Sequence, residues 1–181
     1  MAIRRKWSIF QGFRKETARL RDNATTAAAL ILLLLPSVAR AEGNYCSLLP
    51  VSDVAAVLGA PVTQSGDHAP SGTPKLLAQN CKYETKEVHR KYLRMDVTTT
   101  PTADDAAKVF TAGSSLFGST LGPQPVSGLG DEALLFTKSG SLYVRKKNVC
   151  LHFNLSSYGL SDDTKAKLLK LVAIKALSRL H

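Results

Sequence analysis

Alternation of apolar and polar residues predicts β-strands in the middle and second half of the chain. The clearest case is residues 92–100, in which Leu93, Met95 and Val97 alternate with Arg94, Asp96 and Thr98. This two-residue period is typical of a strand that buries one face. We expect five such strands, over residues 80–87, 92–100, 133–137, 141–146 and 149–156, and one or two further strands between the first helix and the first of these. Short Ser-Gly and Lys-Asn turns separate the last three, which predicts a β-meander.

The same period divides the meander into two faces. Leu142 and Val144 share one face, as do Val149, Leu151, Phe153 and Leu155. We expect Tyr143, Arg145, Cys150, His152 and Asn154 on the opposite side.

Helical spacing of apolar residues predicts three helices, each with a capping signal. The first covers residues 50–59, with Ser52 as its N-cap and Gly59 as its stop. The second starts after an N-cap at Thr102 and ends near 117–118, and the third opens at Ser161 and runs to the end of the chain. We interpret residues 64–78 as a mobile surface loop and 118–130 as a turn-rich connection. This order predicts an α+β domain with a mostly antiparallel sheet covered by helices.

The N-terminal 41 residues have the zones of a secretory signal peptide. A basic segment is followed by a nine-residue apolar run, 27–35, which is too short to span a bilayer. Pro36 ends this run, and the segment Ala39-Arg40-Ala41 suits signal peptidase, so we expect cleavage after Ala41. We therefore expect a signal peptide over 1–41 and a single exported domain over 42–181, in the periplasm or outside the cell. The alternative is an uncleaved membrane anchor, and both Sec and twin-arginine export remain open.

Removing the signal peptide changes the interpretation of the charge. The whole chain has a net charge of +10, whereas residues 42–181 hold 16 basic and 12 acidic residues, a net charge of +4. The aromatic residues are few and do not interleave with the basic ones. These two observations argue against a nucleic-acid partner.

All three cysteines lie in the expected exported domain. We favour a disulfide between Cys46 and Cys81, because one precedes the first helix and the other opens a strand. Its loop of about 35 residues would stabilise the fold by roughly 3–4 kcal/mol. Cys150 would remain a buried, inert thiol.

The candidate chemistry is sparse, and we assign no catalytic, cofactor-binding or metal-binding residue. Asp131 and Glu132 directly precede the strand expected at 133–137. If they have strand geometry, they should point to opposite faces and cannot converge on one substrate. Cys150 and His152 lie on one face, about 7 Å apart by strand spacing, so a hydrolase-like enzyme built on them is one alternative.

A second alternative is a basic surface module that binds an anionic envelope polymer. Its basic residues would be Arg90, Lys91, Arg94, Lys138, Arg145, Lys146 and Lys147.

Several short motifs resemble the LpqN-like family of uncharacterised bacterial exported proteins and lipoproteins. The motifs are Cys46-Ser47-Leu48-Leu49-Pro50, residues 54–59, Cys81-Lys82-Tyr83, residues 126–133 and residues 142–146. The resemblance implies an α/β sandwich and an envelope location, supports the Cys46–Cys81 pair, and carries no general activity. Residues 43–45 do not form a lipobox, which favours soluble secretion over lipid anchoring.

Together these observations favour an exported, non-catalytic domain that binds an unknown protein or small ligand of the cell envelope. We expect no cofactor, no nucleic acid and no stable membrane span after cleavage. The residues we single out as a possible ligand face are Tyr143, Arg145 and His152.

Overall fold

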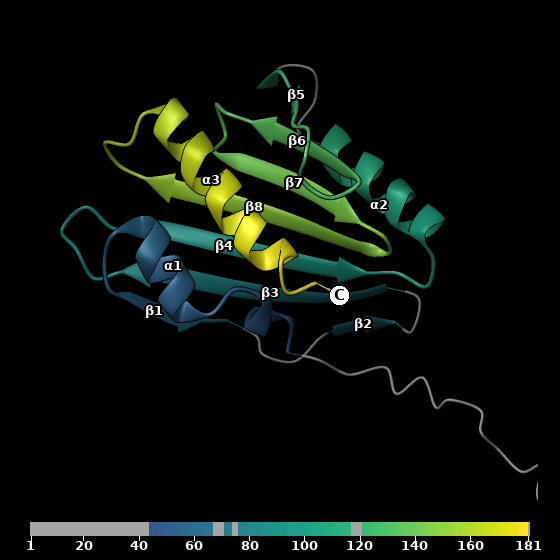
Figure 1. Ribbon diagram of the computed structural model, residues 1–181, viewed down its shortest axis with the longest axis horizontal. Helices are drawn as coiled ribbons and strands as arrows, with labels where there is room; N and C mark the ends of the chain where they lie inside the picture. The colour runs from purple at the N-terminus through teal and green to yellow at the C-terminus, as the bar shows by residue number, and fades with distance from the viewer. Residues whose placement is uncertain (1–43, 67–70, 74–75, 117–120, 181) are drawn as a thin grey trace, which may run out of the picture. The chain divides into compact units, whose positions relative to one another are not determined.

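A computed structural model of the chain describes residues 44–66, 71–73, 76–116 and 121–180 (Figure 1). The expected signal peptide and its cleavage site lie outside these residues. The helical elements are η1 (Tyr45–Leu48), α1 (Val51–Leu58), α2 (Ala103–Ser115) and α3 (Asp162–Leu177). The strands are β1 (Val62–Ser65), β2 (Ser71–Thr73), β3 (Leu76–Thr85), β4 (Lys91–Thr99), β5 (Gln124–Pro125), β6 (Glu132–Phe136), β7 (Ser141–Lys146) and β8 (Val149–Ser157).

The eight strands of the described part of the chain form one antiparallel sheet. Its order is β1-β3-β4-β8-β7-β6-β5, and β2 also pairs with β3. The expected α+β class, with a mostly antiparallel sheet covered by helices, is therefore confirmed. The pairing of β4 with β8 joins the first hairpin to the meander, and it places residue 96 opposite residue 152.

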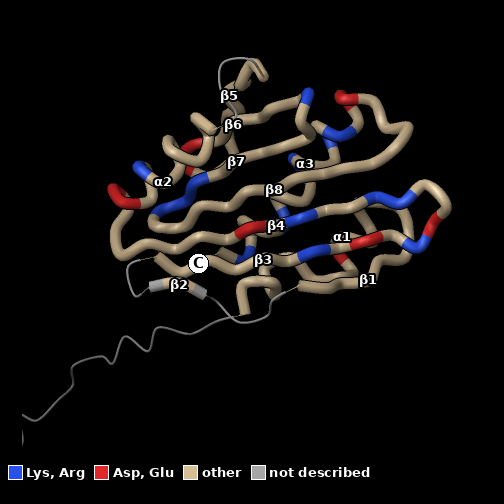
Figure 2. Tube along the Cα trace, turned by 180° about the vertical axis from the view of Figure 1, so that it is seen from behind, with Lys and Arg blue, Asp and Glu red and all other residues tan. Residues whose placement is uncertain are grey.

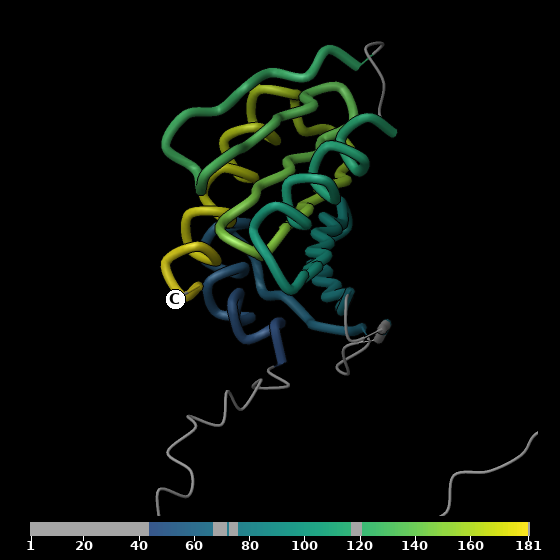
Figure 3. The backbone as a smooth tube through the Cα atoms, turned by 90° about the vertical axis from the view of Figure 1, so that its right-hand side faces the viewer, coloured from purple at the N-terminus to yellow at the C-terminus, as the bar shows by residue number. Residues whose placement is uncertain are grey.

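Helices cover the two faces of the sheet unequally. The face that we call the core face packs against α1 and α3, and it supplies the large inward residues Tyr83, Phe153 and Leu142. Among the described helices, the other face packs against α2, whose residues Ala106 and Phe110 lie over β7 and β8. Figure 3 shows α1 and α3 on one side of the strands and α2 on the other. This helical layer is thus uneven, because α2 packs mainly on β7 and β8.

Two of the three helices begin at the caps that the sequence predicts. The side chain of Thr102 accepts a hydrogen bond from the backbone NH of Asp105, and Ser161 does the same for Thr164. For α1 the expected cap at Ser52 is wrong, because Pro50 occupies the N-cap position and makes no side-chain cap bond. Gly59 ends α1 in the left-handed conformation, with φ of 71°, as expected of a stop glycine.

The expected loop over residues 64–78 is wrong where the structure describes it. This stretch holds the end of β1, all of β2 and the start of β3. Both short strands pair with β3, from Val62 opposite Thr85 and from Ser71 opposite Ala78. Edge strands of three or four residues carry too little alternation to be recognised from sequence.

The Cys46–Cys81 disulfide is formed, with its two Cα atoms 5.6 Å apart. It joins η1 to β3 on the core face, where both cysteines are buried. Nearby, the backbone NH of Tyr45 donates to Oε1 of Gln79 at 2.6 Å. The bridge therefore holds the start of the domain against β3.

Candidate functional site

The most organised polar region lies on the part of the sheet that α2 leaves uncovered. We call it the open face, and it comprises the outward side chains of β3, β4, β8 and β7 beside α2: Asn80, Lys82, Glu84, Tyr92, Arg94, Asp96, Tyr143, His152 and Asn154. Figure 2, seen from this side, shows basic and acidic positions together along β3 and β4. The two-residue period places these residues outward because Leu93, Met95 and Tyr83 point into the core.

Asp96 is the centre of this face. Its Oδ1 accepts a hydrogen bond from Nε of Arg94 at 2.9 Å and another from the Asn80 amide. Its Oδ2 contacts Nδ1 of His152 at 3.2 Å. Burial raises the pKa of Asp96, but the bonds from His152, Arg94 and Asn80 outweigh that effect and lower the pKa below its usual value. Asp96 is therefore ionised at neutral pH, and Nδ1 of His152 must carry a proton in order to donate to it.

An aromatic stack extends this network towards α2. The rings of Tyr143 and His152 stack with centroids 4.1 Å apart and planes 15° from parallel, and Phe136 packs edge-on against Tyr143 at 5.9 Å. A Cβ atom at Gly113 would lie 3.3 Å from Cε1 of Tyr143, so this glycine lets α2 approach the ring closely. Burial, with a smaller contribution from the charge of Asp96, raises the pKa of Tyr143 to about 12. The phenol is therefore neutral at physiological pH.

Of the three expected ligand-face residues, the structure brings two together. Tyr143 and His152 are in direct ring contact, but the guanidinium of Arg145 is turned towards the far end of the meander. It pairs with Asp131 at 3.1 Å and with Glu132 at 3.3 Å. The expectation that these two acids cannot converge is wrong, because Asp131 lies in the turn before β6, where strand alternation does not apply. Arg145 therefore links β7 to the turn before β6 and to the start of β6, and its charge is compensated by these two acids.

Cys150 is on the same face as His152 but under α2. Its thiol is 7% exposed and donates to the carbonyl of Ala106 at 3.2 Å. Burial raises its pKa to about 11, so very little thiolate is present at neutral pH. Asp96 supplies the orienting carboxylate that the sequence does not reveal for a Cys150/His152 pair, but the thiol is directed into the helix.

Most side chains of the expected basic ridge also have an acidic or carbonyl partner. Lys146 donates to the carbonyl of Leu177, the last residue of α3, and to that of Leu180 beyond the helix. Arg90 pairs with Glu84 at 2.6 Å, and Lys91 with Glu87 at 3.3 Å. These residues therefore do not form a broad basic surface.

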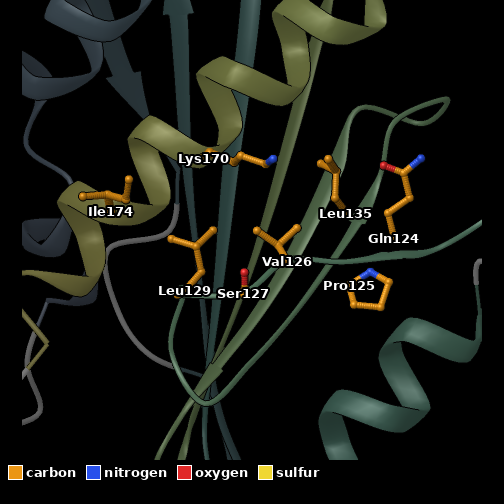
Figure 4. A pocket seen from close by; sticks show the side chains of 9 residues that line it. Gln124, Pro125, Val126, Ser127, Leu129, Leu135, Lys170 and Ile174 are labelled. Atoms are coloured by element: carbon orange, nitrogen blue, oxygen red, sulfur yellow. The ribbon is translucent and has the colours of Figure 1, made fainter.

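Three hollows in the described part of the chain lie away from the open face. One of about 360 Å³ lies between α3 and residues 124–129, with Val126, Leu129 and Ile174 as its apolar walls and Lys170 beside it (Figure 4). A second, of about 370 Å³, continues along α3 and shares Leu129 and Ile174 with the first. A third, of about 320 Å³, lies between residues 87–91 and 157–160. The first two are on the core-face side of the sheet, opposite the network of Asp96.

The described residues contain neither a cluster suited to a metal ion nor a helix suited to a bilayer. No group of three or more His, Cys, Asp or Glu side chains is placed to hold a metal ion. None of the helices that the structure describes has the length and apolar character to cross a bilayer.

Comparison with known proteins identifies a fold relative. No family model matches the chain, and no curated protein matches it. Among solved structures it is similar to the extracellular domain of PknH from Mycobacterium tuberculosis, with a TM-score of 0.50 and 15% sequence identity. The match covers 77% of this chain and 97% of that domain. At this identity the likeness concerns the fold, and the LpqN-like resemblance remains a prediction.

Proposed function

We propose that this chain is an exported, non-enzymatic binding domain of the bacterial cell envelope, related to the LpqN-like proteins, and that its open face receives the ligand or partner. One observation carries the proposal: on this polar sheet face the described part of the chain places only α2, which packs mainly on β7 and β8, yet the side chains beside it are fixed in a connected network centred on Asp96. Preorganised polar groups lower the entropic cost of binding. A fold shared with an extracellular domain is in keeping with this role.

The export part of the proposal is supported by two independent features. Residues 1–41 have the sequence of a signal peptide, and the formed Cys46–Cys81 bridge suits an oxidising compartment. N-terminal sequencing of the exported protein should begin at Glu42. A mature protein that retains residues 30–35 would contradict soluble secretion and indicate a membrane anchor.

The binding part of the proposal is favoured over hydrolysis by the state of Cys150. A nucleophilic cysteine needs a lowered pKa and access to substrate, whereas this thiol has a raised pKa and bonds to α2. Fast alkylation of Cys150 in the folded, oxidised protein would instead support the hydrolase-like alternative.

Site-specific photo-cross-linking in intact cells tests the binding face. A photoreactive amino acid is placed at Ser156, which lies on the exposed side of β8 in line with the open face, and in a matched variant at Leu171, an exposed residue of α3 on the other side of the sheet. We expect an adduct from position 156 that excess unlabelled protein suppresses, with intact-mass analysis to detect small ligands. Equal adducts from position 171, or none from position 156, would contradict an open-face binding site.

A further inference from the structure

The open face holds two basic side chains directly opposite each other. Lys82 on β3 and Arg94 on β4 are Cα partners in the antiparallel register, and both residues are exposed. Like charges in this position destabilise a sheet, because their side chains start only about 5 Å apart. The pair therefore carries a cost that a bound anion would remove.

One carboxylate only partly balances this pair. Asp96 bonds to Nε of Arg94, but it is also shared with His152 and Asn80. Lys82, Arg94 and Asp96 together keep a net charge of +1.

The acids near the two ends of the face do not supply the missing charge. Glu84 pairs with Arg90, and the acids at 131 and 132 pair with Arg145. Glu84 is already paired, and the acids at 131 and 132 share one arginine at the far end of the meander, so the uncompensated positive charge lies between β3 and β4.

The bond to Asp96 also orients the guanidinium of Arg94. With Nε held at 2.9 Å and the side chain 56% exposed, the two Nη groups remain available for a ligand. Within the described residues, no group accepts a hydrogen bond from either Nη of Arg94 or from Nζ of Lys82. A planar guanidinium with two available NH₂ groups matches the paired oxygens of a carboxylate or phosphate.

We propose that Arg94 and Lys82 form an oxyanion subsite on the open face, which binds a carboxylate or phosphate monoester of the ligand; this rests on the function proposed above. Arg94 provides a two-pronged contact, Lys82 provides a second charge, and Asp96 is a positioning residue that holds Arg94.

NMR titration of the purified protein with three probes tests the subsite. Inorganic phosphate and D-glucuronate represent the two oxyanions, and D-glucose is the neutral counterpart of glucuronate. We expect at least one oxyanion to cause saturable shifts of amides in 80–84, 92–96 and 152–154, and glucose to cause none. The probe that binds more tightly identifies phosphate or carboxylate as the preferred group.

Matched variants assign the binding to these side chains. Arg94→Gln should weaken binding about tenfold or more, and Lys82→Gln about threefold to tenfold. The affinity of Arg94→Lys should lie between those of wild type and Arg94→Gln, because lysine keeps the charge but cannot make the two-pronged contact. Lys138→Gln, which removes an exposed charge from the β6–β7 turn, should leave binding unchanged. The unperturbed amide pattern of each variant checks that the sheet is intact.

The outcomes separate this inference from the proposed function. Non-saturable shifts, equal weakening by Lys138→Gln, or equal binding of glucose would overturn the oxyanion subsite. If position 156 forms adducts in cells while neither oxyanion binds, the subsite is wrong and the proposed function stands. If neither experiment detects binding, both are wrong.

Discussion

Replacing Asp96 by asparagine tests whether the network on the open face is a real source of stability. The carboxylate accepts bonds from Asn80, Arg94 and His152, and its side chain is 24% exposed. Asparagine keeps the shape and one acceptor oxygen, so it can still serve two of these donors. Its NH₂ group then faces Nδ1–H of His152, and that bond is lost.

The size of the effect follows from these contacts. A hydrogen bond to a charged group contributes roughly 1.5–3 kcal/mol when shielded, whereas exposed ion pairs contribute only about 0.2–1 kcal/mol. Partial exposure places the loss between these limits, so Asp96→Asn should lower the free energy of unfolding by about 1–2 kcal/mol. For a domain of this size that corresponds to a melting temperature lower by roughly 3–6 °C.

The dependence on pH gives the sharper test. Because the pKa of Asp96 is lowered in the folded state, its stabilisation is complete above the unfolded value of about 3.9 and is lost as the pH falls through the folded-state pKa. Urea unfolding at pH 7 and at about pH 3 should therefore show a difference between wild type and Asp96→Asn that shrinks in acid. A difference of the same size at both pH values would refute the assignment to an ionised, hydrogen-bonded carboxylate.

Four further outcomes follow from the described contacts. Replacing Cys46 and Cys81 by serine should reduce stability by about 3–4 kcal/mol, measured by urea unfolding against the oxidised wild type, and a loss below about 1 kcal/mol would show that the loop closure contributes little. Cys150 should react with a thiol reagent at pH 8 only as fast as the domain opens; labelling at the rate of a free thiol would contradict its burial under α2. Phe110→Ala, which removes a large contact of α2, should cost about 3–4 kcal/mol and accelerate that labelling, whereas an unchanged labelling rate would show that α2 does not shield the thiol. Asp53→Asn, which breaks the pairs of α1 with Lys175 on α3 at 3.0 Å and with Arg179 just beyond that helix, should lower the melting temperature at pH 7 and have less effect below about pH 3.8, because those bonds lower the pKa of Asp53. An equal effect at both pH values would count against the ion pairs.

The features predicted correctly from sequence depend on local chemistry. The caps at Thr102 and Ser161 act on residues three positions away, and the alternation around Leu93 depends only on strand geometry. The Cys46–Cys81 pair was also predicted, since the choice among three cysteines is small.

The features that sequence could not reveal depend on contacts between distant segments. Asp96 was recognised as an outward residue, but its contact with His152 depends on the register of β4 against β8, which joins positions 56 residues apart. The direction in which the Arg145 side chain points depends likewise on the turn that carries Asp131.

The position of the disulfide has a consequence for when the open face forms. Cys81 lies on β3 between Asn80 and Lys82, so the strand that is tied to η1 on the core face presents these two side chains on the other. In a reduced chain β3 loses its covalent tie to η1, and the strand that presents Lys82 is held by its pairing and packing alone. On the function proposed above, the open face would therefore reach its full rigidity only after oxidation of the two cysteines.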